Sequence, residues 1–148
     1  VFPTGKIVCV GCKTPNGAQG ACAFFLGHLR TLGVHVDDAT HTIRNIVSAT
    51  TLPHEVDLVS FACLFPLDSS YEPEVFPGLT YRSRRATFLF FSSGKVVITG
   101  LTAEAQLTPS LETLHRLSMV YKRREESRKN GPTRSNSQGN DGHAASTP

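Results

Sequence analysis

Cysteine and histidine are the residue types in this chain that could bind a metal or carry out redox chemistry. Cys9-x-x-Cys12 has the spacing of a metal or redox motif, and the other cysteines are Cys22 and Cys63. No second pair follows with the spacing of a zinc site. The six histidines lack metal or triad spacing, and neither a G-x-S-x-G nor a phosphate-loop pattern occurs. The sequence therefore predicts no enzyme, no metal site and no cofactor.

The cysteine spacing also differs from that of a disulfide framework. No signal peptide opens the sequence, and no apolar run reaches the length that a transmembrane helix needs. We expect an intracellular, reduced and soluble protein without a membrane partner.

Charge is distributed unevenly along the chain. Of 15 Lys and Arg, six lie from Lys122 onward, and of 12 Asp and Glu, three do, so the preceding residues carry nine of each sign. A neutral body argues against non-specific nucleic-acid binding, which depends on excess positive charge. The length of this body suits one modest core, so we expect a single compact unit.

An internal repeat organises the sequence. The pattern F-x-x-G-K-[IV]-V-x-x-G begins at Phe2 and again at Phe91. The first copy starts at the very beginning of the chain, so we expect the earlier part of that repeat to lie outside it. This predicts the end of a first repeat at 1–33, a second repeat at 34–124 and a disordered polar tail at 125–148.

Periodicity and turn residues predict the elements that must position any site. Strands are expected at 6–10, 34–36 and 42–49, the last two as a hairpin-like pair, and helices at 18–32, closed by Gly33, and from Leu52 to about Leu64. After a loop at 68–78, strands near 79–82, 87–91 and 95–99 form an antiparallel meander. A last helix with Thr108 as N-cap is expected to bury Leu111, Leu114, Leu117 or Ser118, and Tyr121.

Both faces of the meander are apolar. Strict alternation places Leu89 and Phe91 on one face and Phe88 and Phe90 on the other. The two helices of one repeat can cover only one face. A partner protein, a second domain, a lipid or a widened DNA minor groove could cover the second, and periodicity does not choose among them.

Two long stretches resemble a known family. Residues 69–82, Ser-Ser-Tyr-Glu-Pro-Glu-Val-Phe-Pro-Gly-Leu-Thr-Tyr-Arg, are similar to the second-repeat stirrup loop and following strand of the TATA-binding protein family, departing mainly at Val75 and Thr80. Residues 94–100, Gly-Lys-Val-Val-Ile-Thr-Gly, resemble the strand motif behind it. The resemblance covers about residues 1 to 123.

The resemblance implies an α+β fold, a saddle-shaped, curved antiparallel sheet with helices on the convex face, of which about one and a half of the two repeats are present. It implies a basal transcription initiation factor whose concave face binds the minor groove of TATA-type promoter DNA and bends it. The expected partners are double-stranded promoter DNA, TFIIB-like and other general initiation factors and the RNA polymerase machinery. The expected location is the nucleus.

Individual roles follow from the same resemblance. Phenylalanine wedges between base steps are implied at Phe2, Phe76 and Phe91; a donor to minor-groove acceptors at Asn45; flat contacts with base edges and sugars at Val8, Val47, Leu89, Val97 and Thr99; and phosphate contacts at Lys6, Arg82 and Lys95. Glu72 and Glu74 resemble the carboxylates that face TFIIB. Each role has a purely structural alternative. The phenylalanines could belong to the core, Asn45 could cap a turn, and the charged residues Lys6, Glu72, Glu74, Arg82 and Lys95 could simply be solvated.

Three departures from the family pattern favour a divergent member. Val10 stands where the family usually has Thr, the turn between Arg82 and Thr87 is two residues shorter, and the helix at 18–32 offers only Arg30 and His28 as basic residues. The alternative function is therefore a protein-interaction scaffold in polymerase initiation complexes with weak or no TATA-specific DNA binding.

Overall fold

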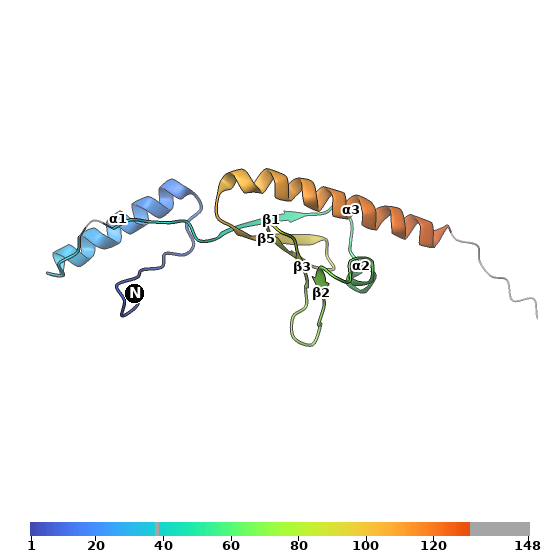
Figure 1. The fold of residues 1–148 in the computed structure, drawn as a ribbon, viewed down its shortest axis with the longest axis horizontal. Helices are drawn as coiled ribbons and strands as arrows, with labels where there is room; N and C mark the ends of the chain where they lie inside the picture. Colours follow the sequence, from blue (N-terminus) through green and yellow to red (C-terminus); the bar gives the residue numbers. More distant parts are fainter. Residues whose placement is uncertain (38, 131–148) are drawn as a thin grey trace, which may run out of the picture.

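An open, five-stranded antiparallel sheet with helices on one side forms the body of the protein, as the α+β prediction required. The computed structural model describes residues 1–37 and 39–130 (Figure 1). The strand order is β1-β5-β4-β3-β2, with β1 (Ile46–Thr51), β2 (Ser69–Ser70), β3 (Leu79–Arg82), β4 (Thr87–Phe90) and β5 (Lys95–Leu101). The helices are α1 (Pro15–Thr31), α2 (Leu58–Leu64), the 3₁₀ turn η1 (Glu104–Gln106) and α3 (Leu107–Lys129).

The predicted meander is confirmed in β3, β4 and β5. In the turn between β4 and β5, the Phe91 amide donates to the Lys95 carbonyl at 2.9 Å, and the Gly94 amide donates to the Phe91 carbonyl at 2.9 Å. Gly94 has φ +83°, in the left-handed region that glycine enters without a steric penalty. The resulting register sets Leu89 opposite Val97, so that both lie on the same face.

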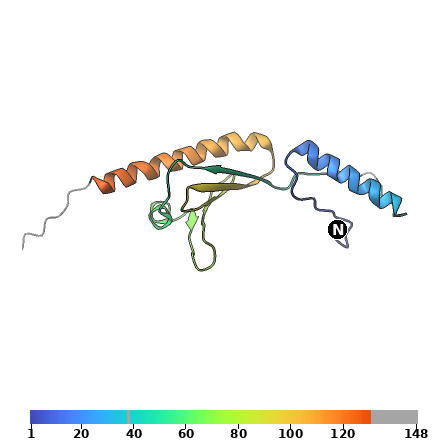
Figure 2. The ribbon, with the colours of Figure 1, turned by 180° about the vertical axis from the view of Figure 1, so that it is seen from behind.

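The core lies on only one face of this sheet. Six strand side chains are 0% exposed: Leu79, Phe88, Phe90, Val96, Ile98 and Leu101. The helices cover them, because Leu114, Leu117 and Tyr121 of α3 and Phe61 of α2 belong to the same buried cluster. Figures 1 and 2 show α3 along one side of the sheet and the loop between β2 and β3 projecting to the other. The alternation inferred for β4 and β5 is therefore confirmed.

The last helix differs in detail from the prediction. It begins at Leu107 rather than with Thr108 as N-cap, because η1 precedes it and the Gln106 side-chain oxygen accepts from the Thr102 and Ala103 amides at 2.8 and 3.0 Å. Leu111 is 40% exposed rather than buried. The helix also continues to Lys129, past the predicted start of the tail at 125. Residues 131–148, where most of that tail was predicted, lie outside the described residues.

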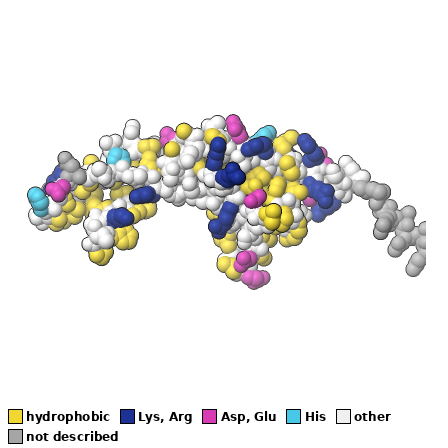
Figure 3. All heavy atoms as spheres, viewed as in Figure 1, with side chains coloured by type: hydrophobic (Ala, Val, Ile, Leu, Met, Phe, Trp, Pro, Cys, Tyr) yellow, Lys and Arg dark blue, Asp and Glu magenta, His cyan; other side chains and the backbone are white. Residues whose placement is uncertain are grey.

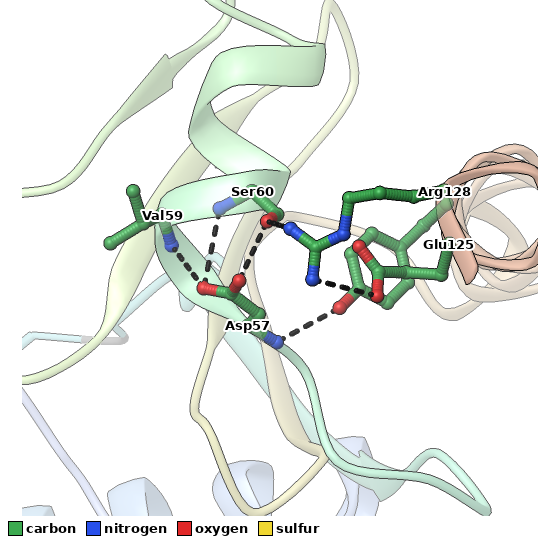
Figure 4. Close-up of polar contacts among 6 residues, drawn as sticks. Asp57, Val59, Ser60, Glu125 and Arg128 are labelled. Atoms are coloured by element: carbon green, nitrogen blue, oxygen red, sulfur yellow. Dashed lines mark hydrogen bonds and ion pairs between the residues drawn. The ribbon is translucent and has the colours of Figure 1, made fainter. Parts of the chain in front are cut away.

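Polar contacts at the end of α3 hold the start of α2 (Figure 4). The Asp57 amide donates to the Tyr121 hydroxyl at 2.9 Å, and the Ser60 hydroxyl donates to the Asp57 carboxylate at 2.6 Å. Arg128 donates to the Ser60 hydroxyl at 3.1 Å and to Glu125 at 3.4 Å. The hydrogen bonds from Ser60 lower the pKa of the Asp57 carboxyl. Through Arg128, the part of α3 beyond residue 124 contacts the body of the protein.

The start of α2 corrects the prediction of a helix from Leu52. The Leu52 amide donates to the Gly94 carbonyl and the Val56 amide to the Ser92 carbonyl, both at 2.9 Å. These amides are therefore used by the turn after β4, and the segment between them stays outside the helix. Asp57 supplies the N-cap, and α2 begins at Leu58.

Stability is expected to fall in mild acid because of His54. Both imidazole nitrogens are buried, and no described group hydrogen bonds to them. Burial lowers the histidine pKa, with a smaller contribution from the Lys122 charge. The His54 imidazole therefore takes up a proton more readily in the unfolded chain than in the folded one. The folded state has its full stability above the unfolded histidine pKa of 6.5 and loses stability as the pH falls below that pKa.

The measurement is urea unfolding at a series of pH values between 7 and 5 (approximately the window set by an unfolded histidine pKa). His54→Phe keeps a ring against Tyr121 and is expected to flatten this part of the curve. His115→Phe replaces an exposed histidine and serves as the control. Parallel curves for the wild type and His54→Phe would contradict the assignment.

The N-terminal segment does not join the body, so the expectation of one compact unit is wrong. Residues 6–10, 34–36 and 42–45 form no strand, and the predicted hairpin-like pair is absent from the described residues. A strand is stabilised by pairing with a neighbour, and none of the described segments pairs with these residues. The helix predicted at 18–32 is confirmed as α1, capped by Thr14 and closed at Gly33, but it buries no residue. Figure 1 shows it beside the body.

The turn that opens the sequence repeat occurs twice in the structure. The Phe2 amide donates to the Lys6 carbonyl at 2.8 Å and the Gly5 amide to the Phe2 carbonyl at 2.9 Å, as in the turn at Phe91. Gly5 has φ +77°, close to the value at Gly94. The division at residue 33/34 stays a prediction, with this repeated turn in its favour.

Candidate nucleic-acid interface

The face of the sheet opposite the core carries a row of small and aliphatic side chains. Register partners place Ala49, Val97, Leu89 and Thr80 side by side across β1, β5, β4 and β3. None of them is fully buried, and Val47, two residues before Ala49, is 60% exposed. A second row pairs Thr99 and Thr87 with Arg82. The result is an apolar surface bordered by hydroxyl groups, with no helix over it.

Asn45 lies beside an irregularity where β1 meets β5. The register shifts between Ile46 and Ser48, so that the Gly100 amide loses its regular partner. The Asn45 side-chain oxygen accepts from this amide at 2.8 Å and from the Thr99 hydroxyl at 3.2 Å. Because a backbone amide can only donate, these contacts orient the carboxamide. Its NH₂ group has no acceptor among the described residues and remains available as a donor.

Two phenylalanines form a pair at the other end of this face. The Phe76 and Phe91 rings are 5.8 Å apart between centroids and meet edge to face at 68°. Phe76 is 37% exposed, and Phe91 is half-buried. Gly78 makes room for them, since a Cβ there would lie 2.7 Å from Phe76 and 3.1 Å from Phe91. The pair is therefore held by contact with the sheet while its surface stays open to solvent.

Three basic side chains predicted to contact phosphate have no acidic partner among the described residues. Lys6, Arg82 and Lys95 are all exposed, and none forms an ion pair within residues 1–37 and 39–130. Arg82 and Lys95 lie at the ends of β3 and β5 in the body, whereas Lys6 lies in the N-terminal segment. Their charges are free to meet an anionic ligand.

The loop between β2 and β3 presents Glu72 and Glu74 at its end. Both side chains are exposed, and the Glu72 carbonyl accepts from the Val75 and Phe76 amides at 3.0 and 2.9 Å, which closes a turn. Figure 3 shows acidic atoms at the tip of this projecting loop, next to hydrophobic ones. The turn places the carboxylates away from the sheet while Phe76 returns to it.

The first-repeat residues are exposed and separated from this surface. Phe2 is 54%, Val8 64% and Val10 85% exposed, and no strand of the described residues pairs with them. The structure thus brings together the second-repeat residues Asn45, Val47, Phe76, Arg82, Leu89, Phe91, Lys95, Val97 and Thr99, but not Phe2, Lys6 and Val8.

Sequence reasoning missed three residues of this surface. Ala49 was detectable, because it follows Val47 at the period of two expected along β1. Thr80 and Gly78 were not, since Thr80 joins the row only through its register with Leu89 and Gly78 matters only through its approach to the two rings.

The described residues hold neither a cluster of metal ligands nor a helix that could span a membrane. Over residues 1–37 and 39–130, no group of three or more His, Cys, Asp or Glu side chains could hold a metal ion. In the same part of the chain, no helix has both the length and the hydropathy needed to cross a bilayer.

Comparisons with known proteins agree with this geometry. The sequence model of the family described as "Transcription factor TFIID (or TATA-binding protein, TBP)" matches residues 40–117, just over half of the 148. TATA-box-binding protein 2 of Haloferax volcanii is 43% identical over 104 residues, covering 68% of this chain and 56% of the relative. TATA-box-binding protein 2 of Entamoeba histolytica is 30% identical over 127 residues, covering 84% and 60%.

A solved structure gives the same result for the fold. Methanococcus jannaschii TBP superposes with a TM-score of 0.62 at 34% identity, covering 72% of this chain and 62% of that one. The saddle fold inferred from the sequence is thus confirmed. The chain spans 56% to 65% of the length of the first curated relatives it matches.

Proposed function

The chain belongs to the TATA-binding protein family, and we propose from this that it is a basal transcription initiation factor that binds TATA-type promoter DNA in the minor groove. The family comprises DNA-binding transcription factors rather than enzymes. The observation that carries the proposal is the uncovered apolar face of the sheet, with the Phe76 and Phe91 pair at its end.

A widened minor groove suits this surface chemically. Its floor offers hydrogen-bond acceptors and sugar atoms but few groups that distinguish one base pair from another. Aliphatic side chains can therefore lie flat against it. Val47, Leu89 and Val97 supply such contacts, and phenylalanines can enter between unstacked base pairs. Bending by inserted apolar side chains is the known behaviour of this family, so it comes with the membership rather than from the geometry.

The polar groups complete the proposed contact. The NH₂ group of Asn45 donates to an acceptor on a base edge, while its oxygen remains bonded to the Gly100 amide. Arg82 and Lys95 contact phosphates and set the register of the protein on the duplex. Phe2, Lys6 and Val8 repeat these roles for the other half of the site, supported by the matching turns at Phe2 and Phe91.

The scaffold alternative is not favoured. It rested on the neutral body, on the few basic residues of the helix at 18–32 and on Val10, which is 85% exposed. The relatives are named for TATA-box binding instead.

Partners and location are part of the proposal. We expect Glu72 and Glu74 to contact a TFIIB-like factor, and the polymerase machinery to assemble on the complex. A nuclear location holds if the chain acts in a eukaryotic cell, since the relatives include archaeal proteins as well as those of Entamoeba histolytica.

The test is fluorescence anisotropy of the full chain with a TATA duplex and a scrambled duplex, with bending measured by energy transfer between end labels. We expect selective binding and a bent duplex. Three phosphate contacts predict a slope of roughly −3 for the logarithm of affinity against the logarithm of salt concentration. Equal affinity for both duplexes without a bend would overturn the proposal.

Glu74→Arg is expected to spare DNA binding and weaken recruitment of a TFIIB-like factor about tenfold, roughly 1.4 kcal/mol, because it reverses an exposed charge at the loop tip. Ternary complex formation on a labelled duplex measures this. Glu112→Arg, the same change at an exposed position of α3, is the control. Undiminished recruitment by Glu74→Arg would remove the carboxylate from the interface.

A further inference from the structure

We propose that Cys9 and Cys22 form a thiol pair that peroxide converts to a disulfide. Their sulfur atoms are 3.7 Å apart, although 13 positions separate the two residues in the sequence. Cys9 is exposed in the segment after the N-terminal turn, and Cys22 is half-buried on α1. Neither residue takes part in the proposed contact with DNA.

The internal repeat makes this pair unusual. The displacement that takes Phe2 to Phe91 takes Cys9 to Ile98, Cys12 to Leu101 and Cys22 to Leu111. Ile98 and Leu101 are 0% exposed members of the aliphatic core behind the sheet. The first repeat therefore has Cys9 and Cys12 at positions whose second-repeat counterparts are buried, while Leu111, the counterpart of Cys22, is 40% exposed.

Little else holds this segment to α1. The helix has no buried residue, and no backbone hydrogen bond among the described residues joins residues 1–12 to it. A covalent link between Cys9 and Cys22 would restrain a segment that noncovalent contacts leave weakly attached.

The surroundings of the two thiols indicate which of them reacts first. The hydrogen bond with Cys9 raises the pKa of the Cys22 thiol, and burial and the charges of Cys9 and Cys12 act in the same direction. Cys22 is also the less accessible of the two, so the exposed Cys9 thiol is the one that meets the oxidant first.

The reaction balances with hydrogen peroxide as the oxidant. The Cys9 thiolate attacks one peroxide oxygen, an S–O bond forms as the O–O bond breaks, and the departing hydroxide takes a proton to give water and Cys9 sulfenic acid. The Cys22 thiolate then attacks the Cys9 sulfur. An S–S bond forms, the S–O bond breaks, and the leaving hydroxide becomes water with the proton released by Cys22. Two thiols are oxidised and one peroxide is reduced to two waters.

The decisive experiment is mass-spectrometric mapping of the full chain after hydrogen peroxide treatment and trapping of free thiols with N-ethylmaleimide. We expect one dominant linked pair of peptides, containing Cys9 and Cys22 and lighter by two hydrogen atoms than the reduced peptides together. Cys63, which is exposed but has no sulfur neighbour within contact distance among the described residues, is expected to be trapped as a free thiol. A dominant Cys9–Cys12 link would overturn the proposal. So would a mixture of linked pairs that matches the mixture formed when the chain is oxidised in urea.

Two variants sharpen the result. Cys12→Ser is expected to keep the link, whereas Cys22→Ser is expected to leave Cys9 as a sulfenic acid that dimedone labels. Hydrogen exchange of amides 6–31 should slow on oxidation in the wild type and in Cys12→Ser, but not in Cys22→Ser. Unchanged exchange in the oxidised wild type would show that the link does not restrain the segment.

The link has a consequence for DNA that rests on the proposed function. It would restrain the segment carrying Phe2, Lys6 and Val8, so we expect the oxidised chain to bind the TATA duplex with a different affinity from the reduced chain. Absence of all TATA binding would defeat the proposed function and leave the peptide mapping intact. Failure of the mapping would defeat only the thiol pair.

Discussion

Phe91→Ala is expected to weaken binding to a TATA duplex about tenfold or more, at least roughly 1.4 kcal/mol, and to reduce the bend, while the protein remains folded. The ring lies on the uncovered face, edge to face with Phe76, and no side chain of the buried core contacts it in the described aromatic pairs. Its loss removes a wedge from the DNA contact and leaves only a shallow gap at the surface. Anisotropy gives the affinity and end-label energy transfer gives the bend.

Phe88→Ala is the matched control, because it removes the same ring from the same hairpin but from the opposite face. Phe88 is 0% exposed and packs against Phe90 and Tyr81. Truncation of a buried phenylalanine costs about 3–5 kcal/mol of stability. A loss of stability in Phe91→Ala as large as in Phe88→Ala would place Phe91 in the core and remove it from the DNA interface.

Gly94→Ala is expected to lower the free energy of unfolding by roughly 2–5 kcal/mol, through an unfavourable backbone conformation and steric overlap together. Gly94 has φ +83°, and an added Cβ would collide with the carbonyl oxygen of His54 and lie 3.0 Å from that of Leu52. Both neighbours are backbone atoms, which cannot swing aside. The same turn holds Leu52 through its bond to the Gly94 carbonyl, so the strain reaches the segment that leads into α2.

Gly100→Ala separates the two contributions. Gly100 has φ +86°, but an added Cβ would meet only the Thr87 nitrogen at 3.9 Å. Its substitution should cost only the backbone penalty, about 1–2 kcal/mol. Urea unfolding followed by circular dichroism measures both variants. Equal losses at the two positions would mean that the contact with His54 and Leu52 contributes nothing.

Local sequence patterns were reliable wherever neighbouring residues decide the structure. Alternation in β4 and β5 assigned Phe88 and Phe90 to one face and Leu89 and Phe91 to the other, because successive side chains of any strand point to opposite sides. The turn at Gly94 could be predicted because it needs a residue that tolerates positive φ, and glycine is the residue type that does so most easily.

Predictions failed where the outcome depended on a distant partner. The segment at 6–10 has the composition of a strand, yet it forms none, because pairing and not composition stabilises a strand. The segment from Leu52 to Val56 has a helix-like beginning, but the turn after β4 takes up two of its amides. The bonds that the Asn45 oxygen accepts from Thr99 and Gly100 were not predicted either, while the donor role expected of its NH₂ group stays a prediction.

By itself, the sequence determined the family, the repeat, the meander and the face on which Phe91 lies, since these depend on motifs and on the period of a strand. Only the tertiary structure decided that Phe76 meets Phe91 over Gly78, that α1 stands apart from the core and that the Cys9 and Cys22 sulfurs are neighbours. Each of these contacts joins residues whose separation along the chain carries no information about their separation in space. Chain folding brings them together, and the packing of the sheet and helices sets their distances.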